Sequence, residues 1–339
     1  MTHSAATMVT VQQTARPHGF PTAGLFAFVE SPVPDPAPGT ALVENLYWSV
    51  DPYHRGMMDA DFALHAPLEG RTLGRVIASR DPGLAEGDLV FHREGWRTHA
   101  LVTEGRAGAR RIRSYEGVPL SAHLSLLGGT GLTAYVALTR TLRLQPGEDL
   151  FVSAAAGGVG TATARIARLL GAGRLVGSAG SAAKVAHLTG HLGYDAAFDY
   201  HDGSVEELLA KAAPDGLDTA LENVGGDHLA GAIANLRHHG RLAWVGAVGQ
   251  YHHADQPPAA PRNLYDIVTK SLRVEGVMVR NYPHLQDEFE DFLVPHLRSG
   301  AVTADATVVE GFDRIVEAFL GMLRGENVGK MLVRAAGQL

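Results

Sequence analysis

The feature that most constrains the fold is a glycine-rich turn that follows directly on a short apolar run. Residues 151–156 read Phe-Val-Ser-Ala-Ala-Ala, and residues 161–170, beyond the turn, are mostly small and apolar. This order predicts a strand, a tight turn and a buried helix, which together open a dinucleotide-binding βαβ unit. A plain tight turn uses the same residue types, but the flanking strand and helix favour nucleotide binding. The turn residues that we expect at the cofactor are Gly157, Gly158, Val159 and Gly160.

Each glycine has a physical reason to be there. Gly157 lets the backbone approach a pyrophosphate, because no Cβ stands in the way. Gly160 lets the helix pack close to the strand, and the helix N-terminus offers free N–H groups to an anion.

The next strand indicates which dinucleotide is bound. NAD-binding units place an Asp or Glu about 20 residues beyond the glycines, where it holds the ribose diol. Residues 174–188 contain no carboxylate, and they carry Ser178 and Lys184 instead. Because a phosphate needs hydrogen-bond donors and positive charge, this segment favours NADP(H). The alternative for Lys184 is an ordinary solvated lysine on a helix.

Composition bounds the class of protein. The chain has 339 residues, 45% hydrophobic and 19% charged, so we expect two soluble domains with sizeable cores. A net charge of −7 argues against nucleic acid or an anionic membrane as the main partner. Without an apolar stretch of membrane-spanning length or a signal-like N-terminus, we expect a cytoplasmic protein. The absence of cysteine excludes disulfides and thiolate zinc sites.

The chain divides by pattern into two parts. Residues 24–118 alternate short strands with turns rich in Pro, Gly and Asp, which predicts an all-β region. A helix follows from about residue 128 to 142, and strands then alternate with helices, which predicts a parallel sheet covered on both faces. Helices are expected at 205–212, 284–298 and 314–323, and a last strand at 330–334.

Several motifs spread along the chain resemble one branch of the zinc-independent medium-chain dehydrogenase/reductase superfamily. The branch holds leukotriene dehydrogenase/prostaglandin reductases, 2-alkenal reductases and bacterial curcumin reductases, and the opening residues 16–19 are most like the last group. The motifs lie at 49–56, 128–135, 155–160, 222–226, 267–273 and 325–330. The resemblance implies an α/β fold in which residues 126–301 form a Rossmann NADP(H)-binding domain. Residues 1–125 and 302–339 would form a GroES-like β-barrel domain for substrate and catalysis.

The resemblance also implies a reaction. Members transfer hydride from NADPH to the β-carbon of an α,β-unsaturated ketone or aldehyde, and hydroxyl donors rather than a metal stabilise the enolate. Tyr53 and Tyr251 are the candidate catalytic residues, and the alternative is that each packs its ring into a domain interface. The ribose hydroxyl of the cofactor is a further candidate for moving the proton.

Other roles follow motif by motif. Thr133 is expected at the nicotinamide, Asn223 at the ribose or nicotinamide, and Asn327 over the cofactor. Tyr200 resembles the tyrosine that joins Ser178 and Lys184 at the 2′-phosphate. Asp51 and Arg55 are either catalytic or a structural ion pair that fixes their loop, and the second interpretation is favoured.

Three departures from the branch concern the substrate. Gly129-Thr130 stands where the branch has Met-Pro, His54 replaces a common Met, and Thr269 replaces a tyrosine. These residues would line or border the substrate pocket, so the substrate is less constrained than the cofactor.

Alternatives from other classes stay open. They are an NADPH quinone oxidoreductase, a non-catalytic NADPH-binding protein and, least favoured, an alcohol dehydrogenase. His187 and His191 have a spacing that can hold a metal, but a solvated helix face is favoured, and we expect no metal. The pair His238-His239 is expected in a loop, also without a metal. Residues 271–279 are predicted to form a sheet-edge strand that pairs with its copy in a homodimer.

Overall fold

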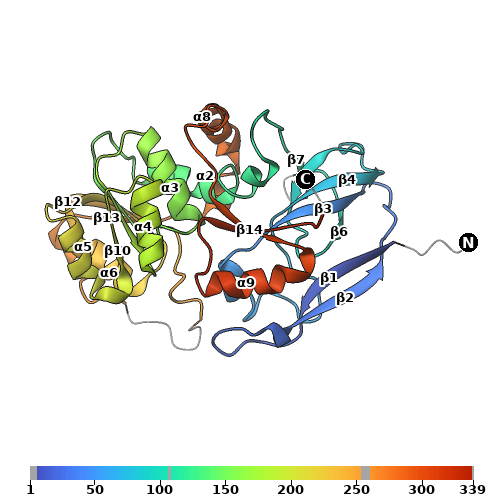
Figure 1. Cartoon of the computed structure of the whole chain (residues 1–339), viewed down its shortest axis with the longest axis horizontal. Coiled ribbons are helices and arrows are strands. Elements are labelled where there is room, and N and C mark those ends of the chain that lie inside the picture. Colours follow the sequence, from blue (N-terminus) through green and yellow to red (C-terminus); the bar gives the residue numbers. More distant parts are fainter. Residues whose placement is uncertain (1–5, 106–107, 253–259, 338–339) are drawn as a thin grey trace, which may run out of the picture. The chain divides into compact units, whose positions relative to one another are not determined.

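The chain folds into two compact units. The computed structural model describes residues 6–105, 108–252 and 260–337. The first unit comprises Met1–Leu124, Thr307–Asn327 and Met331–Leu339, and the second comprises Ser125–Ala306 and Val328–Lys330. Figure 1 shows the chain coloured along its sequence. The roles of these units as substrate and cofactor domains stay a prediction.

The first unit is built mainly from antiparallel strands. A sheet has the order β14-β15-β3-β4-β5-β7, with β6 also paired to β3, and a separate antiparallel pair joins β1 and β2. The strands are β1 (Thr7–Gln13), β2 (Phe26–Pro32), β3 (Ala41–Ser49), β4 (Thr72–Ser79), β5 (Leu89–His92), β6 (His99–Val102), β7 (Arg110–Arg111), β14 (Ala306–Glu310) and β15 (Lys330–Arg334). The helices are α1 (Tyr53–Met57), α9 (Ile315–Leu323) and the 3-10 turns η1 (Ala23–Leu25), η2 (Leu120–His123) and η7 (Phe312–Arg314).

The core of the first unit forms where α9 covers the sheet. Trp48, Trp96 and Phe319 are each no more than 1% exposed. The rings of Trp96 and Phe319 meet edge-on with centroids 5.6 Å apart. Such pairs add directional packing to the burial of apolar area, so this aromatic group fixes α9 on the strands.

The second unit is a doubly wound parallel sheet. Its strand order is β10-β9-β8-β11-β12-β13, so the order reverses at β8. The strands are β8 (Leu150–Val152), β9 (Leu175–Ala179), β10 (Ala196–Asp199), β11 (Leu217–Glu222), β12 (Leu236–Trp244) and β13 (Arg273–Gly276). Ligands of such sheets bind outside the carboxyl ends of the strands at this reversal, here between β8 and β11.

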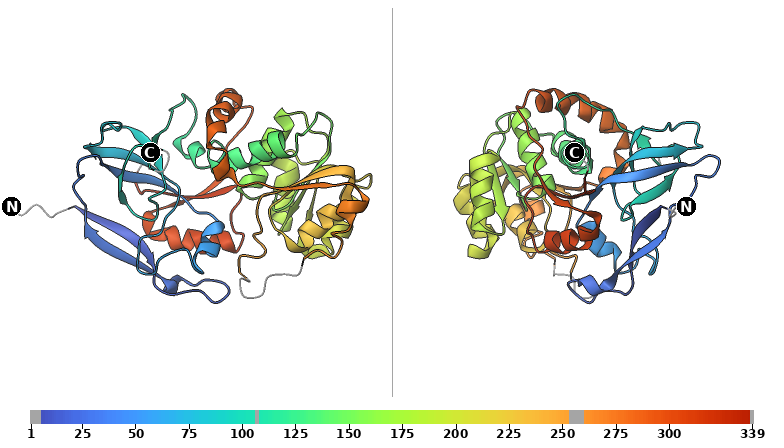
Figure 2. Two further views of the ribbon diagram at one scale, coloured as in Figure 1. Left: turned by 180° about the vertical axis from the view of Figure 1, so that it is seen from behind. Right: turned by 45° about the vertical axis from the view of Figure 1, so that its right-hand side comes forward.

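Helices cover both faces of this sheet, as Figures 1 and 2 show. Helix α2 packs on α3, and α5 packs on α6. The helices are α2 (Gly129–Val136), α3 (Gly158–Leu169), α4 (Ala182–His191), α5 (Val205–Ala212), α6 (Gly226–Asn235), α7 (Asp266–Thr269) and α8 (Gln286–Arg298). The short turns are the π-helix η3 (Ala137–Thr141) and the 3-10 turns η4 (Tyr200–Asp202), η5 (Val279–Asn281) and η6 (Pro283–Leu285). The expected combination of a Rossmann-type sheet with an N-terminal antiparallel domain is confirmed.

Two local expectations need correction. The helix expected up to residue 142 is α-helical only to Val136 and continues as the π-helix η3. The pair His238-His239, expected in a loop, lies inside β12, where the register against β11 shifts by three residues. His239 has a φ of 62°, so this part of β12 is a bulge that sequence periodicity does not show.

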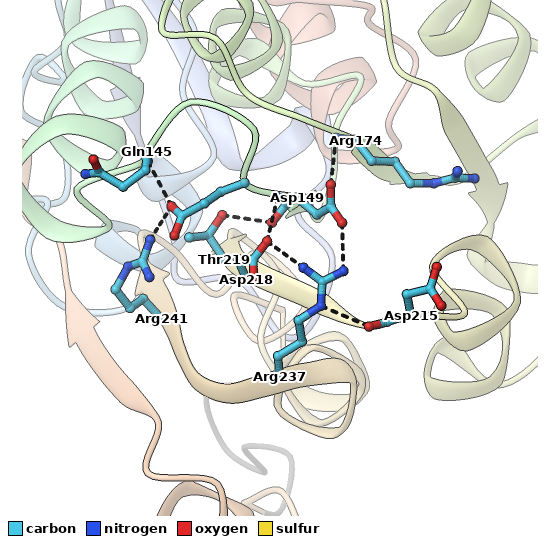
Figure 3. Close-up of polar contacts among 9 residues, drawn as sticks. Gln145, Asp149, Arg174, Asp215, Asp218, Thr219, Arg237 and Arg241 are labelled. Carbon is cyan, nitrogen blue, oxygen red and sulfur yellow. Dashed lines mark hydrogen bonds and ion pairs between the residues drawn. The ribbon is translucent and has the colours of Figure 1, made fainter.

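A polar cluster ties together the amino ends of the parallel strands, opposite the expected ligand edge (Figure 3). Arg237 donates to the carboxylate of Asp218 at 2.6 Å and to that of Asp149 at 2.9 Å. Asp149 also accepts the backbone N–H of Arg174 at 2.8 Å. Arg241 pairs with Glu148 on the same side. Because these residues flank or belong to β8, β9, β11 and β12, the cluster holds the strands in register at that end.

Candidate functional site

The glycine turn has the geometry of an anion-binding helix start. Gly157 is the N-cap of α3, and the N–H of Thr161 bonds back to its carbonyl at 2.9 Å. The first N–H groups of a helix have no acceptor within the helix, so the N-terminal turn of α3 can bind a phosphate. A Cβ on Gly160 would stand 2.3 Å from the carbonyl oxygen of Ala155, so only glycine allows this approach of helix to strand.

The two residues expected at the 2′-phosphate lie at the end of β9 and at the start of the next helix, α4. Ser178 is fully buried, and its Oγ has no hydrogen-bond partner. Ser181 caps α4 by accepting the N–H of Lys184 at 3.3 Å. Burial lowers the pKa of the half-buried Lys184 ammonium. An anion beside Lys184 would offset this cost, since it stabilises the charged form.

Tyr200 lies beside the same turn, directly after β10. It opens η4 and is 40% exposed. A Cβ on Gly180 would lie 3.1 Å from the Tyr200 hydroxyl, so the phenol packs closely on the segment between Ser178 and Ser181. The structure therefore brings Tyr200 next to the end of β9, as the resemblance implied.

A third polar group ends β11. The N–H of Asn223 donates to Ser153 Oγ and its side-chain Nδ2 donates to the Ser153 carbonyl, both at 2.8 Å. Glu222 is fully buried and accepts the N–H groups of Val224 and Gly225 at 2.6 and 2.7 Å. Burial raises the pKa of Glu222 to about 7 although these bonds oppose the shift. The loop after β11 is thus fixed to the end of β8 by the two hydrogen bonds that Asn223 donates to Ser153.

Three of the buried polar atoms that have no hydrogen-bond partner belong to residues at this edge of the sheet. Ser178 Oγ, Glu222 Oε2 and His228 Nε2 are all buried and unpartnered. Native proteins satisfy nearly all buried polar atoms, so unsatisfied ones at one edge indicate a place where a polar ligand binds. Together with the glycine turn, these residues fit a phosphate-bearing dinucleotide.

Thr133 and Asn327 are the remaining candidates for cofactor binding. Thr133 is 7% exposed, and its hydroxyl donates to the Gly129 carbonyl at 2.6 Å within α2. Asn327 is 9% exposed and belongs to the first unit. Their contacts with a cofactor stay predictions.

The two catalytic candidates lie in different units. Tyr53 opens α1 in the first unit, and its hydroxyl donates to Glu69 at 3.2 Å. Burial raises the pKa of Tyr53 above its usual range, with a further contribution from Asp51, so its hydroxyl keeps its proton. Tyr251 belongs to the second unit, where its hydroxyl accepts the N–H of Ala247 at 3.5 Å.

Asp51 and Arg55 do form ion pairs, but not with each other. Asp51 lies 3.2 Å from Arg71 and accepts the hydroxyl of Ser49 at 2.6 Å. Arg55 is 1% exposed and pairs with Asp59 at 2.7 Å. The expected ion pair is therefore wrong as a pair, and each residue has a different charged partner.

The three departures from the branch have different surroundings. His54 is 1% exposed, and its ring meets those of Trp96 and Phe319 in the core of the first unit. Thr130 donates to the Ser125 carbonyl at 2.7 Å. Thr269 is exposed at the end of α7. Whether they border a substrate stays a prediction.

The described residues lack both a cluster that could hold a metal ion and a helix that could span a membrane. Across residues 6–105, 108–252 and 260–337, no three His, Asp or Glu side chains are grouped to hold a metal ion. The rings of His187 and His191 lie 5.2 Å apart on α4 without a third such residue in that described part. No helix among the described residues is long and apolar enough to span a membrane.

Sequence reasoning missed Glu222 and His228 as parts of this edge. The signal for Glu222 was available, since an acid directly after an apolar strand must find donors in the next turn. His228 carries no such signal, because only the fold brings the first turn of α6 beside the end of β10.

Comparison with known proteins identifies the family. A model of the N-terminal domain of oxidoreductases matches residues 10–109, and one of zinc-binding dehydrogenases matches residues 158–298. The chain is 37% identical to the putative NADP-dependent oxidoreductase YfmJ of Bacillus subtilis, over 96% of this chain and 97% of the relative. This protein belongs to the medium-chain dehydrogenase/reductase superfamily.

Similarity to other members of the medium-chain dehydrogenase/reductase superfamily indicates the branch to which this protein belongs. It is 35% identical to an NADP⁺-dependent 2-alkenal reductase of Nicotiana tabacum, over 86% of each chain. The structure of CurA from Vibrio vulnificus in complex with NADPH matches with a TM-score of 0.90 and 29% identity, covering 97% of this chain and 100% of that one. The branch expected from the motifs is thereby confirmed.

Proposed function

We propose that this medium-chain dehydrogenase/reductase is an NADPH-dependent ene-reductase. It transfers hydride to the β-carbon of an α,β-unsaturated ketone or aldehyde. The observation that carries the cofactor choice is the segment from the end of β9 to the first turn of α4, where Ser178 and Lys184 stand in place of a carboxylate. The alkenal reductase among the relatives, alike over most of both chains, supports the reaction class.

NADP(H) is the cofactor, and it supplies the hydride. The N–H groups of residues 158–160 bind the pyrophosphate at the start of α3. Ser178, Lys184 and Tyr200 bind the 2′-phosphate through two hydroxyls and one ammonium. Asn223 and Thr133 orient the ribose and nicotinamide, and Asn327 closes over the cofactor.

Negative charge develops on the carbonyl oxygen of the substrate as hydride reaches the β-carbon. Hydrogen-bond donors aimed at this oxygen lower the barrier, because they stabilise the enolate more than the starting ketone. Tyr53 and Tyr251 are the proposed donors. Burial keeps the pKa of Tyr53 above its usual range, so the hydroxyl carries its proton near pH 7.

The direct test is oxidation of NADPH at 340 nm with an alkenal, an alkenone, a curcuminoid and a quinone, with NADH as the control cofactor. We expect turnover of an enone or enal, with NADPH preferred over NADH. Turnover of the quinone alone would instead support a quinone reductase. Tight NADPH binding without turnover of any compound would contradict the reductase proposal for these substrate classes.

A further inference from the structure

The ring of Tyr200 is held from several sides. Asp199 fixes its turn, because the carboxylate accepts the N–H of His201 at 3.1 Å and lies 2.8 Å from His201 Nδ1. The ring centroids of Tyr200 and His201 are 4.1 Å apart. One edge of Tyr200 lies against Gly180, where an added Cβ would be 3.0 Å from Tyr200 Cε1. The phenol therefore has a defined place beside the end of β9.

His228 contacts a further side of the Tyr200 ring. It lies in the first turn of α6, is 5% exposed, and meets the ring of Tyr200 edge-on with centroids 5.1 Å apart and planes at 74°. Burial lowers the pKa of His228 to about 4, so its ring is neutral near pH 7. A neutral ring brings no charge to an anion site, and its contribution is the shape of the surface on which Tyr200 rests.

A histidine at this buried position is less favourable for stability than an apolar residue would be. Its Nε2 is buried without a hydrogen-bond partner, and an unsatisfied buried nitrogen destabilises the fold. Ring packing against Tyr200 is the favourable contact that the structure does show. This combination suggests a role in the adjoining site rather than in stability.

We propose that His228 is a positioning residue for cofactor selectivity. Its ring holds Tyr200 against Gly180, so that the Tyr200 hydroxyl is in place for the 2′-phosphate that distinguishes NADPH from NADH. A group that is already in place binds more tightly, because less freedom is lost on binding. This inference rests on the proposed NADP(H) site. An edge-on ring pair is worth a change in affinity of about 2- to 10-fold.

The test compares two ligands that differ only in the 2′-phosphate, adenosine 2′,5′-bisphosphate and adenosine 5′-monophosphate, by calorimetric titration. We expect His228→Ala to weaken binding of the bisphosphate about 2- to 10-fold and to leave the monophosphate unchanged. His228→Phe should restore selectivity, since it keeps an edge-on ring. In a Tyr200→Ala background, His228→Ala should cause no further loss, because its effect passes through Tyr200.

Lys184→Ala is the reference variant, because it tests the 2′-phosphate site separately from the role of His228. If Lys184→Ala weakens only the bisphosphate while His228→Ala affects both ligands equally or neither, the role of His228 is wrong and the NADP(H) site stands. An undiminished effect of His228→Ala in the Tyr200→Ala background would also overturn it. If Lys184→Ala fails to discriminate between the ligands, the 2′-phosphate site itself is wrong. If His228→Ala does not fold, His228→Phe and His228→Leu replace it. Wild-type selectivity for the bisphosphate in His228→Phe, with loss of selectivity in His228→Leu, would support the role of His228. Loss of selectivity in His228→Phe would contradict it.

Discussion

The two candidate tyrosines differ in what holds their hydroxyls. Tyr53 donates to a carboxylate, whereas Tyr251 accepts from a backbone N–H and keeps its own hydrogen available. Removal of one hydrogen-bond donor to a developing oxyanion lowers turnover by about 10²- to 10³-fold in well-studied cases. Removing each hydroxyl therefore tests directly whether the two tyrosines are donors.

We expect Tyr53→Phe and Tyr251→Phe each to lower kcat at least about 10-fold, with cofactor affinity unchanged, because each loses only a hydroxyl. Steady-state kinetics with the best enone and titration with NADPH measure both quantities. Tyr47→Phe, which removes a hydroxyl from β3, is the matched control and should keep full activity. Wild-type kcat in both variants would rule the tyrosines out as donors and leave the packing interpretation.

Sequence predicts the residues at this scale unevenly. Gly160 and the capped start of α4 near Lys184 follow from local rules, because turn and helix chemistry depend on neighbours along the chain. The contact of His228 with Tyr200 does not, since it joins α6 to the end of β10. Asp51 and Arg55 show the same limit, because the sequence predicted one ion pair, whereas the fold brings Asp51 to Arg71 and Arg55 to Asp59.

Among the elements, the parallel strands have opposite chemistry at their two ends. Their carboxyl ends carry unsatisfied polar atoms, and their amino ends carry the ion-paired cluster of Figure 3. Burial would raise the pKa of Asp218, but hydrogen bonds from the Asp149 N–H and from Arg237 outweigh it and hold this pKa below its usual value. A carboxyl with a lowered folded-state pKa stabilises the protein above its unfolded-state pKa of about 3.9. That stability is lost as the pH falls further, through the folded-state pKa.

We therefore expect Asp218→Asn to lower the free energy of unfolding by about 1–2 kcal/mol at pH 7. The difference from wild type should shrink as the pH falls from about 4 towards 3, because the wild-type carboxyl then becomes protonated. Urea unfolding across this pH range measures it, and the exposed Asp61→Asn is the control. A difference that is the same at pH 7 and pH 3 would show that the charge of Asp218 does not contribute.

Element boundaries were predictable where one periodicity runs unbroken. Helix α5 has the bounds expected from its pattern, Val205–Ala212. The end of α2 and the bulge in β12 were not, because a π-turn and a positive φ at His239 leave no periodic signature.

For the whole molecule, the alternation of strands and helices was enough to predict a Rossmann-type sheet joined to an antiparallel domain. The edge position of β13 in its sheet agrees with the predicted strand at 271–279, while the homodimer stays a prediction. The substrate depends on residues such as Thr130 and Thr269, where the chain departs from its branch, and no local rule assigns a ligand to them.

The central claim is hydride transfer to the β-carbon of an enone. Product analysis by NMR after reduction with NADPH deuterated at either face of C4 of the nicotinamide tests it directly. We predict that one of the two labelled cofactors places deuterium on the β-carbon of a saturated ketone or aldehyde, and that the α-carbon takes its hydrogen from solvent. Deuterium on the carbonyl carbon, with an alcohol as the product, would contradict the account.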